Sequence, residues 1–411
     1  MKISAQSSHQ PWFWSGIGIG LILVFGQFER WQFSKTMAIY LHDGLILGWL
    51  VSLGWLHRVE WLNLAWFKLK FHQYRQELIG LSWLGLGWAL AGVQAQDFSV
   101  WWRPGFYLLR LIVGWAFAQF LVKLWPKSLA GFYPKFLIMI GSLIAWLGLI
   151  QYFWLPDTRF LKTFGWDDHY YRLISTLLDP GFTGLILVLT FIGLITWQSR
   201  RQIGLQFLGL IGLELALLLT YSRASYLSFG VALIWLWWQS WRRHQFHRPT
   251  VGLTVLAIII LIAGIKFLPQ VTGEGVRLER TSTITSRWNT NFLALQQLSL
   301  SQWWLGKGLF VTKPINQVSE STLPDHAQLP DNILVNLLTG IGWGGILVAI
   351  KVWGGKAWKW WQRAPIWLQC LWLATLVHSL FNNSLFQPQI WLLLQLWTAL
   401  HNQKQPTETK A

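Results

Sequence analysis

Three short segments place an arginine or an aspartate beside a long apolar run or an amphipathic stretch. Arg223 stands in TYSRAS between two such runs, Arg287 stands in TSRWNTNF, and Asp331 stands in LPDNILV just before another run. An arginine side chain presents a planar fork of donors that suits the oxygens of a diphosphate better than a lysine does. A carboxylate can take a proton from a hydroxyl group if its pKa is suitable. These residue types could therefore bind a diphosphate and activate a hydroxyl group.

Five further polar residues could take part in the same chemistry. They are Arg172, Arg277, Arg280, His326 and Asn332. The arginines would add positive charge for an anionic substrate, and His326 is a second candidate base. Each candidate also has a plain structural interpretation. An arginine beside a membrane span can reach the headgroups, a polar interval can be a solvated loop, and Pro330 and Asp331 can simply start and cap a helix.

Local patterns predict the elements that carry these residues. Ser222 and Ser225 flank Arg223 and could cap the ends of helices there. Arg287 precedes apolar residues at helical spacing, which predicts an amphipathic helix lying along the membrane interface. The apolar residues are Trp288, Phe292, Leu295 and Leu298.

Two other patterns give weaker indications. The consecutive Asp-Asp-His at 167–169 could bind a metal ion, but no fourth ligand stands at a recognisable spacing, so a solvated loop is favoured. The Gly-Lys-Gly at 306–308 predicts a turn, because it lacks the spacing and the flanking serine or threonine of a phosphate-binding P-loop. We expect neither a metal site nor a cofactor.

The composition indicates the solvent around these segments. Of the 411 residues, 53% are hydrophobic and only 12% are charged, whereas a soluble domain carries about 25% charged residues. Repeated apolar windows of about 20 residues are long enough to cross a bilayer. Many of the 33 tryptophans stand at the ends of these windows, as interfacial belts predict. We therefore predict an all-α polytopic membrane protein rather than a barrel.

Hydropathy windows predict about twelve spans in a single transmembrane domain, 1–411. Basic residues concentrate in alternate loops, which places those loops and both termini in the cytoplasm. The same loops account for most of the formal charge of +17, so no nucleic-acid partner is predicted. The residues 269–331, between the ninth and tenth spans, then form one large extracytoplasmic loop. The predicted spans are 12–27, 37–56, 78–95, 106–125, 133–153, 181–198, 204–220, 225–241, 251–268, 332–353, 365–381 and 388–401.

Asp43, Arg110 and Glu214 are ionisable and fall inside predicted spans. Charged side chains are costly in lipid and usually face the interior of a helix bundle. They could pair with one another or line a polar path, and the sequence favours neither. Because Cys370 is the single cysteine, no disulfide can form within the chain.

Several motifs occur in an order and spacing that resemble the O-antigen ligase and O-antigen polymerase family of membrane glycosyltransferases. The match covers roughly 172–345 by motif, and the predicted topology is similar along the whole chain. The family pattern has a histidine where Asp331 stands, and the nearest histidine is His326. The matching elements are Ser222-Arg223-Ala224 at a span boundary, Arg287-Trp288 in the large loop, the turn at 306–308, Asp331-Asn332 followed by Gly342 and Gly345, and Arg172, Thr176 and Pro180 before the sixth span.

The resemblance implies a metal-independent, inverting glycosyltransferase of the bacterial plasma (inner) membrane, with its active site on the periplasmic side. A base would deprotonate an acceptor hydroxyl, which attacks the anomeric carbon of a glycan linked to undecaprenyl diphosphate. Arg223 and Arg287, with Arg172 as a lesser candidate, would stabilise the leaving diphosphate. The partners would be this lipid-linked glycan, a polysaccharide or lipid acceptor, and membrane lipid. The acceptor would decide between ligase and polymerase.

The replaced histidine leaves three alternatives. Asp331 could serve as the base, His326 could reach the same place, or the chain does not catalyse the transfer. A different function would be a transporter for a small anion such as bicarbonate, with substrate sites near the midplane. Another would be a non-catalytic subunit of envelope polysaccharide assembly, in which Arg223 and Arg287 tolerate substitution. Convergence of these arginines with Asp331 or His326 would favour the glycosyltransferase.

Overall fold

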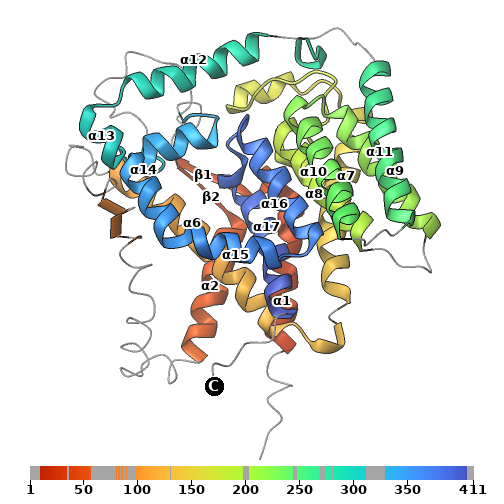
Figure 1. The fold of residues 1–411 in the computed structure, drawn as a ribbon, viewed down its shortest axis with the longest axis horizontal. Coiled ribbons are helices and arrows are strands. Elements are labelled where there is room, and N and C mark those ends of the chain that lie inside the picture. The colour runs from red at the N-terminus through yellow and green to blue at the C-terminus, as the bar shows by residue number, and fades with distance from the viewer. Residues whose placement is uncertain are drawn as a thin grey trace, which may run out of the picture.

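Helices dominate the computed structural model (Figure 1). The strands of its described residues form one antiparallel hairpin. The all-α class is therefore confirmed for this part of the chain, with the hairpin as the exception. The described residues are 10–34, 37–56, 80, 82–83, 85–86, 89, 99–129, 131–197, 203–243, 248–268, 274–279, 281–311 and 329–404. The candidates Arg280 and His326 lie outside them.

The elements follow one another in two groups along the chain. The first group is α1 (Gln10–Ile22), η1 (Leu23–Glu29), β1 (Arg30–Ser34), β2 (Met37–Tyr40), α2 (Leu41–Leu56), α6 (Ser99–Leu124), η2 (Lys127–Leu129), α7 (Phe132–Trp154), η3 (Arg159–Phe164), η4 (Ser175–Leu177), α8 (Pro180–Thr196) and α9 (Ile203–Leu219). The second group is α10 (Arg223–Arg242), α11 (Arg248–Phe267), η5 (Glu274–Val276), α12 (Ser282–Gln296), α13 (Leu300–Leu305), α14 (Ile333–Ala349), the π-helical η8 (Ile350–Gly354), α15 (Gly355–Arg363), α16 (Ile366–Ser379), η9 (Ser384–Phe386) and α17 (Pro388–Lys404).

Four helical segments in the described part are long and apolar enough to cross a membrane. They are Trp12–Glu29, Pro104–Leu124, Phe132–Trp154 and Ile333–Arg363. Four shorter apolar helices accompany them, at Pro180–Thr196, Gln206–Leu219, Val251–Phe267 and Ile366–Ser379. These segments support the membrane assignment. Most of the predicted span 78–95 lies outside the described residues, so the number of spans stays a prediction.

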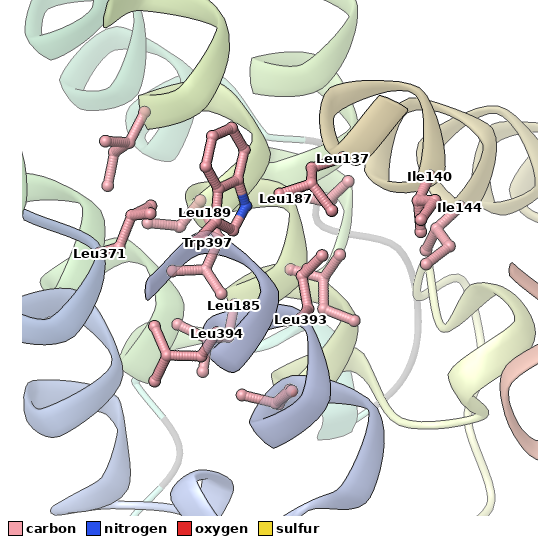
Figure 2. Close-up of a cluster of buried hydrophobic side chains, with 14 of the residues drawn as sticks. Leu137, Ile140, Ile144, Leu185, Leu187, Leu189, Leu371, Leu393, Leu394 and Trp397 are labelled. Atoms are coloured by element: carbon pink, nitrogen blue, oxygen red, sulfur yellow. The ribbon is translucent and has the colours of Figure 1, made fainter. Parts of the chain in front are cut away.

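The core is centred on α8. Every residue from Leu185 to Ile192 exposes 2% or less of its surface, and a helix that is apolar all round is one that neighbours surround. Two glycines bring the neighbours close: a Cβ at Gly141 of α7 would meet Thr190, and one at Gly193 would meet Trp397 of α17. Small residues allow such close approach of membrane helices. Figure 2 shows Leu185, Leu187 and Leu189 of α8 between Leu137, Ile140 and Ile144 of α7, Leu371 of α16, and Leu393, Leu394 and Trp397 of α17.

A glycine-rich turn after α13 docks on α14. The amides of Lys307 and Gly308 each donate to a carbonyl of α14, on Thr339 and Gly340, at 2.9 Å. Gly306 has φ 74°, and a Cβ there would lie 2.2 Å from the Gly340 oxygen. Gly342, with φ 64°, interrupts α14 beside this turn. The predicted turn at 306–308 is therefore confirmed, and only glycine fits this approach.

A charged cluster joins the hairpin to α2 and α6. Arg110 Nη2 lies 2.7 Å from Asp43 Oδ2, and His42 Nδ1 lies 2.6 Å from Glu29 Oε1. All four side chains expose 12% or less. The sequence left open whether the ionisable residues in the spans pair with one another or line a polar path. Asp43 and Arg110 form a pair. Glu214 differs, because its buried Oε1 atom has no hydrogen-bond partner among the described residues.

Candidate active site

Arg287 connects three segments that are far apart in the sequence. Its Nε lies 3.3 Å from Asp331 Oδ2. Its Nη1 donates to the Phe381 carbonyl at 2.5 Å, and its Nη2 donates to Asn382 Oδ1 at 3.4 Å. The side chains of Arg287 and Asp331 are 34% and 39% exposed, so a substrate can reach both. The guanidinium therefore fastens α12 to the start of α14 and to the turn after α16.

Helix α12, which carries Arg287, runs along one edge of the molecule (Figure 1). Its outward stripe is apolar: Ile284, Trp288 and Phe292 are 57%, 71% and 51% exposed. This pattern supports a helix at the membrane interface. The prediction that Arg287 precedes the helix was wrong, because α12 begins at Ser282. The serines and threonines before Arg287 concealed this start. The Thr285 hydroxyl donates to the Thr281 carbonyl, a hydrogen bond that a threonine can form within a helix.

Arg223 begins α10. The predicted cap is confirmed, because Ser222 is the N-cap and its hydroxyl accepts from the Ser225 amide at 3.4 Å. Arg223 Nη1 donates to the Leu278 carbonyl at 3.1 Å. Burial and, to a smaller extent, the like charge of Arg287 lower the pKa of Arg223. Two guanidinium groups close enough to repel each other would be stabilised by an anion between them.

Asp331 and Asn332 divide two tasks at the start of α14. Asn332, not Asp331, caps the helix, since its Oδ1 accepts from the Leu334 amide at 2.8 Å. Its Nδ2 donates to the Leu380 carbonyl at 2.9 Å. The interpretation of Asp331 as a cap was therefore wrong, and its carboxylate is left for Arg287. Burial raises the pKa of Asp331, and the positive charge of Arg287 offsets this only in part. A raised pKa makes a carboxylate a better base.

Arg172 lies below the surface rather than in the open site. It is 8% exposed, and it donates to the carbonyls of Thr220 and Tyr221 at 3.1 and 3.3 Å. These carbonyls belong to the turn that leads into Arg223. The geometry gives Arg172 the task of holding this turn. Arg277 is exposed and directly precedes Leu278, whose carbonyl Arg223 contacts.

The sequence Asp-Asp-His at 167–169 does not converge on one point. Asp167 and Asp168 are exposed, whereas His169 is buried. Asp168 lies 3.6 Å from the Lys162 ammonium. In the described part of the chain, no group of three or more His, Cys, Asp or Glu side chains could hold a metal ion.

Three residues of this region were not found by sequence reasoning: Asp179, His378 and Asn382. Asp179 caps α8, where its Oδ1 accepts from the Phe182 amide at 2.7 Å. Burial raises the pKa of Asp179, and the hydrogen bond from the Phe182 amide offsets part of this rise. The Asp-Pro pair was a recognisable helix start. His378 lies inside the predicted span 365–381. Its position could have marked it as a candidate, because polar residues are costly within a membrane and usually have a function there.

The structure thus brings Arg223, Arg287, Asp331 and Asn332 together at one end of the bundle. Arg172 is buried and holds the turn that leads into Arg223. Arg277 is exposed and precedes Leu278, which Arg223 contacts. His326 and Arg280 stay predictions. Neither a family model nor a curated protein matches this chain.

Proposed function

We propose that this chain is a glycosyltransferase of the O-antigen ligase or polymerase type. It would transfer a glycan from undecaprenyl diphosphate to an acceptor hydroxyl on the outer face of the bacterial plasma membrane. One observation carries the proposal. Arg287 lies 3.3 Å from the partly exposed carboxylate of Asp331 and bonds to the turn after α16, and Ser225, in the first turn of the helix that Arg223 begins, contacts His378 of the same α16.

In this proposal the two arginines hold the diphosphate. The bond between the anomeric carbon and the diphosphate oxygen breaks, and the leaving group gains negative charge. Preorganised cations at that point stabilise the transition state more than the ground state. The like charges of Arg223 and Arg287 would then both face an anion, which removes their mutual repulsion.

Asp331 is the proposed base. It would take the proton of the acceptor hydroxyl while the acceptor oxygen attacks the anomeric carbon from the face opposite the diphosphate, which inverts the configuration. Arg287 pairs with this carboxylate at 3.3 Å. A bound diphosphate competes for the same guanidinium and would release the carboxylate for the acceptor. His326 remains the second candidate for the base.

The proposed orientation follows the charge distribution of the loops. About twelve spans would place both termini in the cytoplasm and 269–331 on the periplasmic side. The exposed apolar stripe of α12 supports an element that lies along the outer interface, where a lipid-linked donor would arrive. The acceptor would decide whether the enzyme is a ligase or a polymerase.

The test replaces each arginine in turn. Arg223→Ala and Arg287→Ala should abolish transfer from an undecaprenyl-diphosphate-linked glycan in membranes that contain normal amounts of protein. Arg159→Ala is the matched control, because this arginine is exposed, forms an ion pair with Asp157 at 2.6 Å and lies in a loop predicted on the same side.

Unchanged transfer in both variants would overturn the proposal. If deletion of the gene also leaves surface glycans intact, the result favours a transporter for a small anion. Uptake of bicarbonate should then be measured. If deletion alters the glycans while both variants retain activity, the chain is a non-catalytic subunit.

A further inference from the structure

A buried chain of hydroxyl groups and one histidine lies behind the proposed site. His378 of α16 is 0% exposed, and so are Ser225 of α10 and Ser384 of η9. His378 Nε2 lies 3.1 Å from Ser225 Oγ, and His378 Nδ1 lies 2.6 Å from Ser384 Oγ. We call Ser222, Ser225, His378 and Ser384 the histidine network.

The hydrogen bonds around Ser384 favour one tautomer of the ring. Ser384 Oγ donates to the Asn382 carbonyl at 2.5 Å, so its hydrogen is not available to His378. This arrangement suits a ring that donates from Nδ1 to Ser384 and faces Ser225 with Nε2. Ser225 has one hydroxyl hydrogen, for which Nε2 at 3.1 Å and the Gly181 carbonyl at 3.2 Å are both acceptors. Its oxygen lies 2.8 Å from Ser222 Oγ, which extends the network to the residue before Arg223.

The histidine network joins the two segments that orient the arginines. On one side, Ser222 and Ser225 form the cap from which Arg223 projects. On the other side, the turn from 380 to 384 offers the acceptors for Arg287 on Phe381 and Asn382. The same turn contacts Asn332 through the Leu380 carbonyl. His378 is bonded to both sides through its two ring nitrogens.

We propose that His378 is a positioning residue that sets the separation of Arg223 and Arg287, and with it the affinity for a polyprenyl diphosphate. This inference rests on the proposed function. A neutral imidazole suits the task, because it accepts on one side and donates on the other at a fixed distance. Buried polar networks whose members are all satisfied are rigid, and rigid cations bind a diphosphate without losing energy to reorganisation.

The test uses Ser225→Ala and Ser384→Ala, each of which removes one partner of His378 and little volume. Binding of undecaprenyl diphosphate to the purified protein should weaken by about threefold to tenfold in each variant, the factor that one buried hydrogen bond supplies. Because both serines act through one imidazole, the double variant should weaken binding by less than the product of the single effects. The KM for the glycan donor should rise in parallel, while the KM for the acceptor stays constant.

Thr375→Val is the matched control. Thr375 lies one turn before His378 and is 0% exposed, and its hydroxyl donates to the Leu371 carbonyl of its own helix. This variant should keep the wild-type affinity, and its melting temperature measures the cost of losing a buried hydroxyl alone.

Two results would overturn the inference. One is wild-type affinity for undecaprenyl diphosphate in both serine variants while Arg223→Ala and Arg287→Ala lose it. The other is a pair of effects that multiply independently, which would remove His378 as the common link. Failure of the proposed function gives a different pattern: the arginine variants themselves bind undecaprenyl diphosphate and transfer glycan like the wild type.

Discussion

Replacing Asp331 with asparagine removes one charge and keeps the size of the side chain. The carboxylate forms an ion pair with Arg287 at 3.3 Å, and both side chains are more than a third exposed. Asn332, not Asp331, caps α14, so the helix start should survive the substitution. The variant therefore tests the chemistry of the carboxylate with little change to the fold.

The expected effects on stability and on rate differ widely in size. A partly exposed ion pair contributes only about 0.2 to 1 kcal/mol to folding, because solvent screens it. Loss of a general base lowers a rate by about 100-fold to 10,000-fold, or about 3 to 5 kcal/mol in the activation free energy. Because Asp331→Asn also frees Arg287 from a competing carboxylate, the KM for the glycan donor should not rise. We expect a large fall in kcat with a nearly unchanged melting temperature.

Two assays measure these quantities. Initial rates of transfer from an undecaprenyl-diphosphate-linked glycan in detergent give kcat and KM, and thermal unfolding of the same sample gives the melting temperature. In the host cell, surface polysaccharide on a gel separates the two reaction types. Collapse to single repeats indicates a polymerase, and full-length polymer held on the lipid carrier indicates a ligase.

Asp168→Asn is the control for loss of an outer carboxylate, since Asp168 is exposed and pairs with Lys162 at 3.6 Å. It should retain the wild-type rate. A kcat for Asp331→Asn within about threefold of wild type, far below the effect of a lost base, would refute Asp331 as the base. His326→Ala would then be the next variant. A strong loss of stability would contradict the geometric argument instead.

Three further predictions follow from the same geometry. Burial raises the pKa of Asp331, so kcat/KM should fall as the pH drops through this raised value; an acid limb at the usual aspartate pKa would contradict the assignment. Burial also raises the pKa of Asp179, so its ionised form destabilises the fold at pH values above the unfolded pKa. Asp179→Asn should therefore keep or raise the melting temperature at pH 7, whereas Asp179→Ala loses the cap and about 1 kcal/mol; a less stable asparagine variant would be the contrary result. Gly342→Ala should unseat α13 and abolish transfer, because φ is 64° and the Cβ would lie 2.4 Å from the Trp304 oxygen. Gly212→Ala, with nothing within 4 Å of the added Cβ, should have no effect on transfer.

The sequence was informative where one short stretch decides the structure. The cap at Ser222 and the glycine turn at 306–308 were both predictable, because a serine before a helix and glycine at positive φ are local requirements. The same holds for the apolar helices, whose length and composition suit a membrane. Local signals failed at Asp331, where two neighbouring residues could both cap, and the choice of Asn332 depended on the contact of its amide with Leu380.

The sequence by itself determined that this is a helical chain suited to a membrane, with arginines and an aspartate at the ends of its apolar runs. Only the tertiary structure decided which of them meet. Arg287 contacts Phe381 and Asn382 across 94 and 95 residues of sequence, and His378 contacts Ser225 across 153. These meetings depend on how α8, α10 and α16 pack, which small residues and shape decide together over the whole bundle. No single segment of the sequence carries that information, because the packing of each helix is fixed by partners that stand elsewhere in the chain.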